Sequence, residues 1–149
     1  MKDELAYPVA GVGRRLAAMI YDALLLIALW AVATALFLPL TGGEYIESGG
    51  PLITNAYRLA LILVWVGFYG LFWIRSGQTL GMLAWRLKLV CESGEPVRWR
   101  DVIARLAAGV LSFLPAGLGF FWLWFDRERL TWHDRLSHTR PIVLPKRAK

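Results

Sequence analysis

The pattern of hydrophobic and polar positions divides this 149-residue chain into three long apolar runs separated by shorter polar segments. The first run, residues 16–40, contains one charged residue, Asp22, and the second, residues 53–74, also contains one, Arg58. At a rise of 1.5 Å per residue, a helix of either length can cross a hydrocarbon layer of about 30 Å. We therefore predict two full transmembrane helices, over 16–40 and 53–74.

The third apolar run, residues 102–125, is long enough to cross but is interrupted by Pro115, Gly117 and Gly119. A single crossing would place the C-terminal tail, residues 126–149, outside the cell. That tail is strongly basic, and basic segments are preferentially retained in the cytoplasm. We therefore predict that the run breaks near Pro115 into two half-helices, a re-entrant or interfacial hairpin that returns to the cytoplasmic side.

The segments between the runs are polar and differ in charge. Residues 41–51 contain two glutamates and no Lys or Arg, which favours an external loop. In residues 75–101, Leu87 and Leu89 alternate with basic residues and are followed by a turn-forming sequence at 93–96. We predict a short cytoplasmic β-like hairpin or interfacial segment here. The expected fold is an all-α polytopic membrane protein with a single domain, residues 1–149, and both termini in the cytoplasm.

Composition supports a membrane location and excludes several other classes. Hydrophobic residues make up 57% of the chain, and its mean hydropathy is +0.47, above the usual range of a water-soluble domain. The net charge of +6 is better explained by cytoplasmic loops and anionic lipid headgroups than by nucleic acid. A cleaved signal peptide is disfavoured because the first run is too long for an h-region and carries Asp22. Cys91 is the only cysteine, so it forms no internal disulfide.

Asp22 is the most informative residue of the first run. An ionisable group inside an apolar helix costs roughly 2.5–3.5 kcal/mol unless it is paired, neutral or hydrated. Arg105 is expected at a similar depth, so we predict an Asp22–Arg105 ion pair. The pair either locks the first helix against the third segment, or belongs to a site at which Asp22 exchanges a proton or cation. Arg15 is expected to bind a lipid phosphate or a C-terminal carboxylate.

Residues 131–139 contain both histidines of the chain, with His133 beside Asp134 and close to Ser137. This composition invites comparison with a nucleophilic or metal site. Adjacent side chains seldom converge, however, and neither a third ligand nor an oxyanion hole is evident. We favour a structural role in capping or docking the tail, and expect no enzymatic activity, cofactor or metal site.

Three segments, GRRLAAMIYD, GQTLGMLAWRLKLV and TWHDRLSHT, together resemble the RDD family of small membrane proteins. The resemblance covers nearly the whole chain, in the right order. It assigns the family arginine to Arg15 and its two aspartates to Asp22 and Asp134, with His133 and Thr139 in the closing segment. The chain departs from the family at His138, where glycine is usual, which puts a tight glycine turn there in doubt.

The resemblance implies a bacterial plasma (inner) membrane protein of largely undefined role. Relatives are suspected of transport, including sodium or other cation/proton exchange, and some look like scaffolds for membrane assemblies. The first hypothesis is therefore an exchanger or transport component that works at Asp22 as a homo-oligomer or with a membrane partner protein. The alternative is a non-catalytic adaptor or assembly factor that binds partner proteins or anionic lipid.

Overall fold

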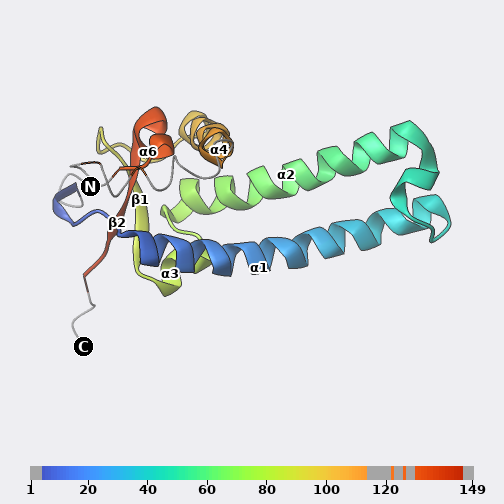
Figure 1. Cartoon of the computed structure of the whole chain (residues 1–149), viewed down its shortest axis with the longest axis horizontal. Coiled ribbons are helices and arrows are strands. Elements are labelled where there is room, and N and C mark those ends of the chain that lie inside the picture. The colour runs from blue at the N-terminus through green and yellow to red at the C-terminus, as the bar shows by residue number, and fades with distance from the viewer. Residues whose placement is uncertain (1–4, 114–121, 123–125, 127–129, 146–149) are drawn as a thin grey trace.

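The protein consists of a long helical hairpin that projects from a compact end (Figure 1). The structure, a computed structural model, describes residues 5–113, 122, 126 and 130–145. The hairpin is formed by α1 (Val12–Phe37) and α2 (Gly50–Ser76), which run in opposite directions. Two short 3-10 helices, η2 (Leu38–Thr41) and η3 (Ile46–Gly49), lie in the connection between them.

Both predicted long helices are present, and each begins about a turn earlier than its apolar run. At their C-terminal ends the two differ, because α1 stops at Phe37, before its run ends, whereas α2 continues past its run to Ser76. Pro39 lies in the first turn of η2, and Gly42 and Gly43, both with positive φ, reverse the chain. Gly77, with φ of +72°, ends α2 in the left-handed conformation that favours glycine.

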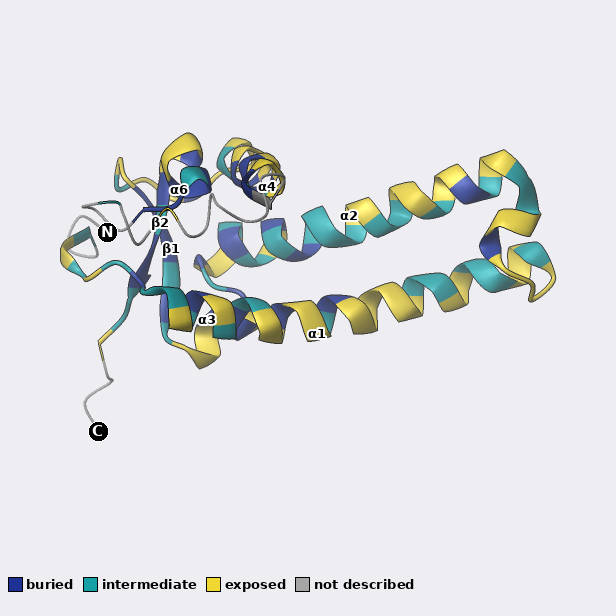
Figure 2. Ribbon diagram, in the orientation of Figure 1, coloured by how far each residue is buried: buried dark blue, intermediate teal, exposed yellow. Residues whose placement is uncertain are grey.

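The hairpin exposes its apolar side chains instead of burying them (Figure 2). In the most apolar 18-residue stretches of the two helices, only 6% and 17% of the residues are buried. The core helix of a soluble protein would be mostly buried, because exposing apolar area to water costs roughly 25 cal/mol per Å². Both helices are thus long and apolar enough to span a membrane, and their exposure is consistent with lipid as their solvent.

Five shorter elements pack around the base of the hairpin: α3 (Leu80–Ala84), β1 (Leu87–Cys91), α4 (Trp99–Phe113), α6 (Trp132–Ser137) and β2 (Thr139–Val143). Together with the first turns of α1 and the last turns of α2 they make the compact end (Figure 1). Its core is formed by Ala10, Ala18, Trp73, Met82, Leu87, Leu89, Cys91, Val97, Val102 and Leu106.

The two strands form an antiparallel sheet in which Leu87 faces Val143 and Cys91 faces Thr139. The predicted β-like hairpin within residues 75–101 is therefore only half correct. Its first strand exists, but the turn that follows leads into α4 and not into a second strand. The partner strand, β2, comes from the end of the chain. The sequence of residues 75–101 alone therefore could not identify it.

Residues near the two ends of the chain lie side by side. The Ala10 amide donates to the Pro141 carbonyl oxygen at 2.8 Å, and the Val143 amide donates to the Pro8 carbonyl oxygen at 2.9 Å. The segment predicted only as a basic tail, residues 126–149, thus contributes a helix and a strand to the compact end.

The third apolar run begins inside α4, which ends at Phe113, just before Pro115. The predicted break at Pro115 lies outside the described residues, as do 114–121 and 123–125. α4 lies across the α1–α2 hairpin, since it is seen nearly end-on in Figure 1 while the hairpin runs along the page. α6 packs against α4. The described residues before and after this gap therefore lie at the same end of the hairpin.

Candidate functional site

One buried carboxylate joins three elements of the compact end. Asp134 on α6 accepts a short hydrogen bond from Nη1 of Arg15 on α1 at its Oδ2. Its Oδ1 lies 2.8 Å from Nη2 of Arg105 on α4. The Asp134 side chain is fully buried, and both guanidinium groups are nearly so. Because isolated buried charges are strongly unfavourable, each of these groups depends on the others for its burial.

The local sequence around Asp134 fixes its side chain in this position. Thr131 caps α6: its hydroxyl accepts from the Asp134 amide at 3.3 Å, while Asp134 Oδ2 accepts from the Thr131 amide at 3.0 Å. This reciprocal arrangement is a capping box. On the other side, Nη1 of Arg105 donates to the Thr139 hydroxyl at 2.8 Å. The carboxylate therefore stabilises both the start of α6 and the junction of α6 with α1 and α4.

The charges around Asp134 keep it ionised. Burial alone would raise the pKa of Asp134, but the positive charges of Arg105 and Arg15 outweigh this effect and hold the pKa below its ordinary value. The Nε of Arg15 donates to the Ala10 carbonyl oxygen at 2.9 Å, which further orients the guanidinium toward the carboxylate. Asp134 is thus the charged partner of both arginines at neutral pH.

His133 is buried beside this cluster in its neutral form. Burial, with a smaller contribution from Arg105, lowers the pKa of His133 to about 3. Its Nε2 lies 3.0 Å from the Thr131 hydroxyl. The Ser137 hydroxyl donates to the His133 carbonyl oxygen at 2.6 Å, so it caps a backbone carbonyl of α6.

Asp22 is also buried, but its partners are neutral donors. Its Oδ2 accepts from the Thr79 hydroxyl at 2.6 Å, and its Oδ1 accepts from the Gly81 amide at 2.9 Å. The predicted Asp22–Arg105 ion pair is therefore not formed. Arg105 pairs instead with Asp134 on α6, and Asp22 accepts hydrogen bonds from Thr79 and Gly81 at the start of α3. Sequence spacing could not show that Asp134 returns to the base of α1.

Although Asp22 and Arg105 are not paired, they face the same cavity. This cavity, about 80 Å³ in volume, lies between α1, α2, α3, α4, α6 and the sheet. Its charged or titratable lining consists of Arg15, Asp22, Tyr69, Arg105 and His133, and the rest is largely apolar. Arg15 and Asp22 thus line the same cavity, and Asp134 lies next to it because it is paired with Arg15.

The segment GQTLG, which follows α2, builds the Asp22 side of this cavity. Thr79 caps α3 by accepting from the Met82 amide at 3.1 Å while it donates to Asp22. Gly81 allows α3 to touch α1, because a Cβ at this position would lie 2.2 Å from the Ala18 carbonyl oxygen. Sequence analysis identified this segment as a family block but missed Thr79 and Gly81 as partners of Asp22. A threonine followed by an apolar helical turn was the available signal.

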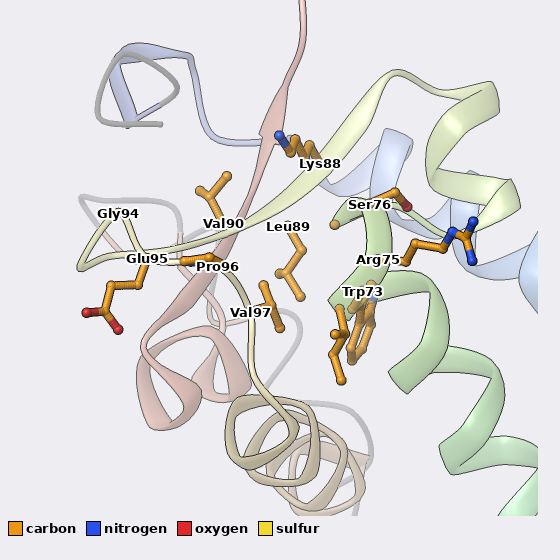
Figure 3. Close-up of a pocket in the computed structure, with 12 residues that line it drawn as sticks. Trp73, Arg75, Ser76, Lys88, Leu89, Val90, Gly94, Glu95, Pro96 and Val97 are labelled. Carbon is orange, nitrogen blue, oxygen red and sulfur yellow. The ribbon is translucent and has the colours of Figure 1, made fainter.

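A second cavity, about 150 Å³ in volume, lies between the end of α2, β1 and the turn before α4. Figure 3 shows Trp73, Leu89 and Val97 pointing into it, whereas the charged ends of Arg75 and Glu95 point away at opposite sides. Because its inner surface carries apolar side chains, we regard this cavity as a packing gap at the base of the hairpin.

A family model described as the RDD family matches residues 9–138 of the chain. The matched range contains Arg15, Asp22, Arg105 and Asp134, the charged residues that the structure gathers at the base of the hairpin. No curated protein and no solved structure matches the chain.

Proposed function

The chain belongs to the RDD family, and from this premise we propose that it is an integral membrane protein that exchanges a proton or a monovalent cation at Asp22. The observation that carries this proposal is that the two buried carboxylates, Asp22 and Asp134, have different kinds of partner. Asp134 is fixed between two arginines, whereas Asp22 is held by a hydroxyl and an amide and faces a cavity.

Neutral donors are the kind of partner that a titrating carboxylate needs. An ion pair with arginine would keep Asp22 charged, because a buried guanidinium cannot lose its proton at ordinary pH. A hydroxyl can instead donate to the ionised carboxylate and accept from the protonated acid. Asp22 can therefore lose or gain a proton, or bind a small cation from the cavity, without leaving its hydrogen-bonded position.

The hairpin and the distribution of charges support the proposed membrane arrangement. α1 and α2 cross a bacterial plasma (inner) membrane, and the compact end lies at the cytoplasmic surface. The pairing of residues 8–10 with β2, and of α4 with α6, supports a chain whose two ends are on one side. The abundance of arginine at that end favours the cytoplasm.

Two crossing helices cannot enclose a pathway through a bilayer, so the exchanger works as a homo-oligomer or with another membrane protein. The outward apolar faces of α1 and α2 are available for such contacts, as their exposed residues include Leu24, Ile27, Leu36, Ile62 and Leu63. In this arrangement the Asp22 cavity forms the cytoplasmic part of the pathway, and neighbouring subunits supply the rest.

The test is cation-driven proton movement in proteoliposomes that contain the purified protein. Asp22→Asn is the informative variant, since an amide can still accept from Gly81 and donate to Thr79. Glu95→Gln removes an exposed carboxylate in the same compact end and is the matched control. We expect flux in the wild type and in Glu95→Gln, and its loss in Asp22→Asn. Equal flux in all three proteins would contradict the role of Asp22.

A second candidate function is a non-transporting membrane adaptor. It is favoured by the satisfied hydrogen bonds of Asp22, which also dock α3 onto α1 and so have a structural use. On this hypothesis the wild-type protein gives no flux with any cation, and Asp22→Asn changes only the stability of the protein or its assembly with partner proteins. Flux measurement therefore separates the two functions directly.

A further inference from the structure

α4 carries an apolar face that the rest of the described protein leaves exposed. Ile103, Val110 and Leu111 are each at least half exposed, and Ala107 lies on the same side of the helix. The spacing of these residues, at i, i+4, i+7 and i+8, is that of one helical face. The opposite face is buried in the compact end, where it contributes Val102, Arg105, Leu106, Ala108 and Ser112.

The orientation of α4 relative to the hairpin determines where this apolar face points. α4 lies across the α1–α2 hairpin (Figure 1). In Figure 2 its buried side is turned toward α6 and its exposed side is turned the other way, in the direction in which the hairpin extends. If the hairpin crosses a bilayer, α4 therefore runs along the bilayer plane and presents its apolar face toward the hydrocarbon.

The level of α4 along the hairpin is fixed by a close contact with α2. A Cβ added to Gly70 would lie 2.3 Å from the Trp99 ring, so the indole at the start of α4 rests directly on the α2 backbone. Gly70 precedes the end of α2, Ser76, by fewer than two helical turns, or about 9 Å. α4 thus begins at the depth where an apolar span gives way to headgroups, the region that tryptophan prefers.

We propose that α4 is an in-plane interfacial helix whose exposed face is covered by phospholipid of the bilayer that the hairpin crosses. Trp99, about half exposed and one helical turn before Ile103, connects this face to α2 through its contact with Gly70. The exposed arginines at the N-terminal end of α4, Arg98 and Arg100, are more than half exposed and long enough to reach headgroup phosphates. Helices with this distribution of apolar and basic residues lie in membrane interfaces.

Spin-label accessibility in liposomes tests this proposal on the full-length protein. Single cysteines are introduced at Ile103 and Val110 in a Cys91→Ala background and labelled with a nitroxide. Leu63→Cys, in the apolar part of α2, serves as the lipid-exposed control. Ser93→Cys, in the exposed turn before α4, serves as the water-exposed control. Each label is then exposed to oxygen, which concentrates in lipid, and to a nickel chelate, which stays in water.

We expect the labels at Ile103 and Val110 to resemble the Leu63 label, with oxygen favoured over the nickel chelate, although at a shallower depth. Labels that favour the chelate, as Ser93 does, would overturn the proposal by showing that the face is hydrated. Labels shielded from both reagents would also overturn it, by showing that protein covers the face. The Leu63 label reports separately on the hairpin, and none of these results depends on whether Asp22 supports exchange.

Discussion

At the scale of single residues, the compact end depends on a few buried charges that stabilise one another. Asp134 closes the capping box of α6 and at the same time neutralises the guanidinium groups of Arg15 and Arg105. Removing one member of such a buried group leaves the others without compensation, which is more destabilising than replacing the whole group. Arg15 and Asp134, which the sequence resemblance assigned to the family signature, are thus partners in a single interaction.

Asp134→Asn should therefore destabilise the protein by about 3–5 kcal/mol, because it leaves two buried guanidinium groups without a counter-charge. The measurement is denaturant unfolding of the purified protein in detergent micelles. Glu95→Gln breaks the exposed Glu95–Arg98 pair and should change the free energy of unfolding by at most about 1 kcal/mol. Similar stability of the two variants would contradict the importance of the buried cluster.

The buried neutral His133 should make stability depend on pH. The pKa of His133 falls from its ordinary value of 6.5 to about 3 on folding, so between these values the unfolded chain binds a proton that the folded protein excludes. Stability should therefore fall as pH falls below 6.5. Unfolding midpoints measured from about pH 7 to about pH 5 should decrease less in His133→Gln than in the wild type, since Asp134 does not titrate in that range. Parallel profiles of the two proteins would show that folding does not lower the pKa of His133.

His138 occupies the left-handed conformation, with φ of +49°, at the end of α6. Glycine adopts this conformation without the strain that a Cβ brings. His138→Gly should stabilise the protein by about 1 kcal/mol in the same unfolding assay. His138→Ala also removes the contact with Glu92 but keeps a Cβ. A gain in His138→Ala equal to that in His138→Gly would refute the explanation.

At the scale of elements, the two long helices could be predicted because apolar length alone determines them. The pairing of β1 could not, since its partner β2 lies about 50 residues away and is itself short, which gives little local signal. The start of α4 was likewise hidden, because Arg98, Arg100 and Asp101 look like loop residues until the buried face of the helix is known.

The contact between α3 and α1 should be sensitive to a single methyl group. In Gly81→Ala the new Cβ would meet the Ala18 carbonyl oxygen at 2.2 Å and Asp22 Oδ1 at 2.9 Å, so α3 must move away from α1. We expect a loss of about 1–3 kcal/mol in the free energy of unfolding. Gly109→Ala is the control, because a Cβ there meets nothing within 4 Å and alanine favours the helix. Equal effects of the two substitutions would show that α3 is not docked on α1.

At the scale of the whole molecule, sequence patterns predicted a membrane hairpin and the family, but not the compact end. Arg15, Asp22 and Asp134 were identified as a set through family resemblance, while their geometry required knowledge of where α6 returns. The predicted Asp22–Arg105 ion pair is absent because Asp134 pairs with Arg105, although Asp22 and Arg105 line the same cavity. The depth of a residue in a membrane can be estimated from sequence. Whether Arg105 pairs with Asp22 or with Asp134, however, depends on tertiary packing.

The proposed arrangement places the compact end on the cytoplasmic side of a membrane that the hairpin spans. Single cysteines in a Cys91→Ala background, at Tyr45 in the hairpin loop, Ser93 before α4 and His138 after α6, test it with a membrane-impermeant thiol reagent. We expect Tyr45→Cys to react in intact cells, and Ser93→Cys and His138→Cys to react only after permeabilisation. Reaction of His138→Cys from the same side as Tyr45→Cys would contradict the account, because residues 114–129 would then cross the membrane and α6 could not pack against α4.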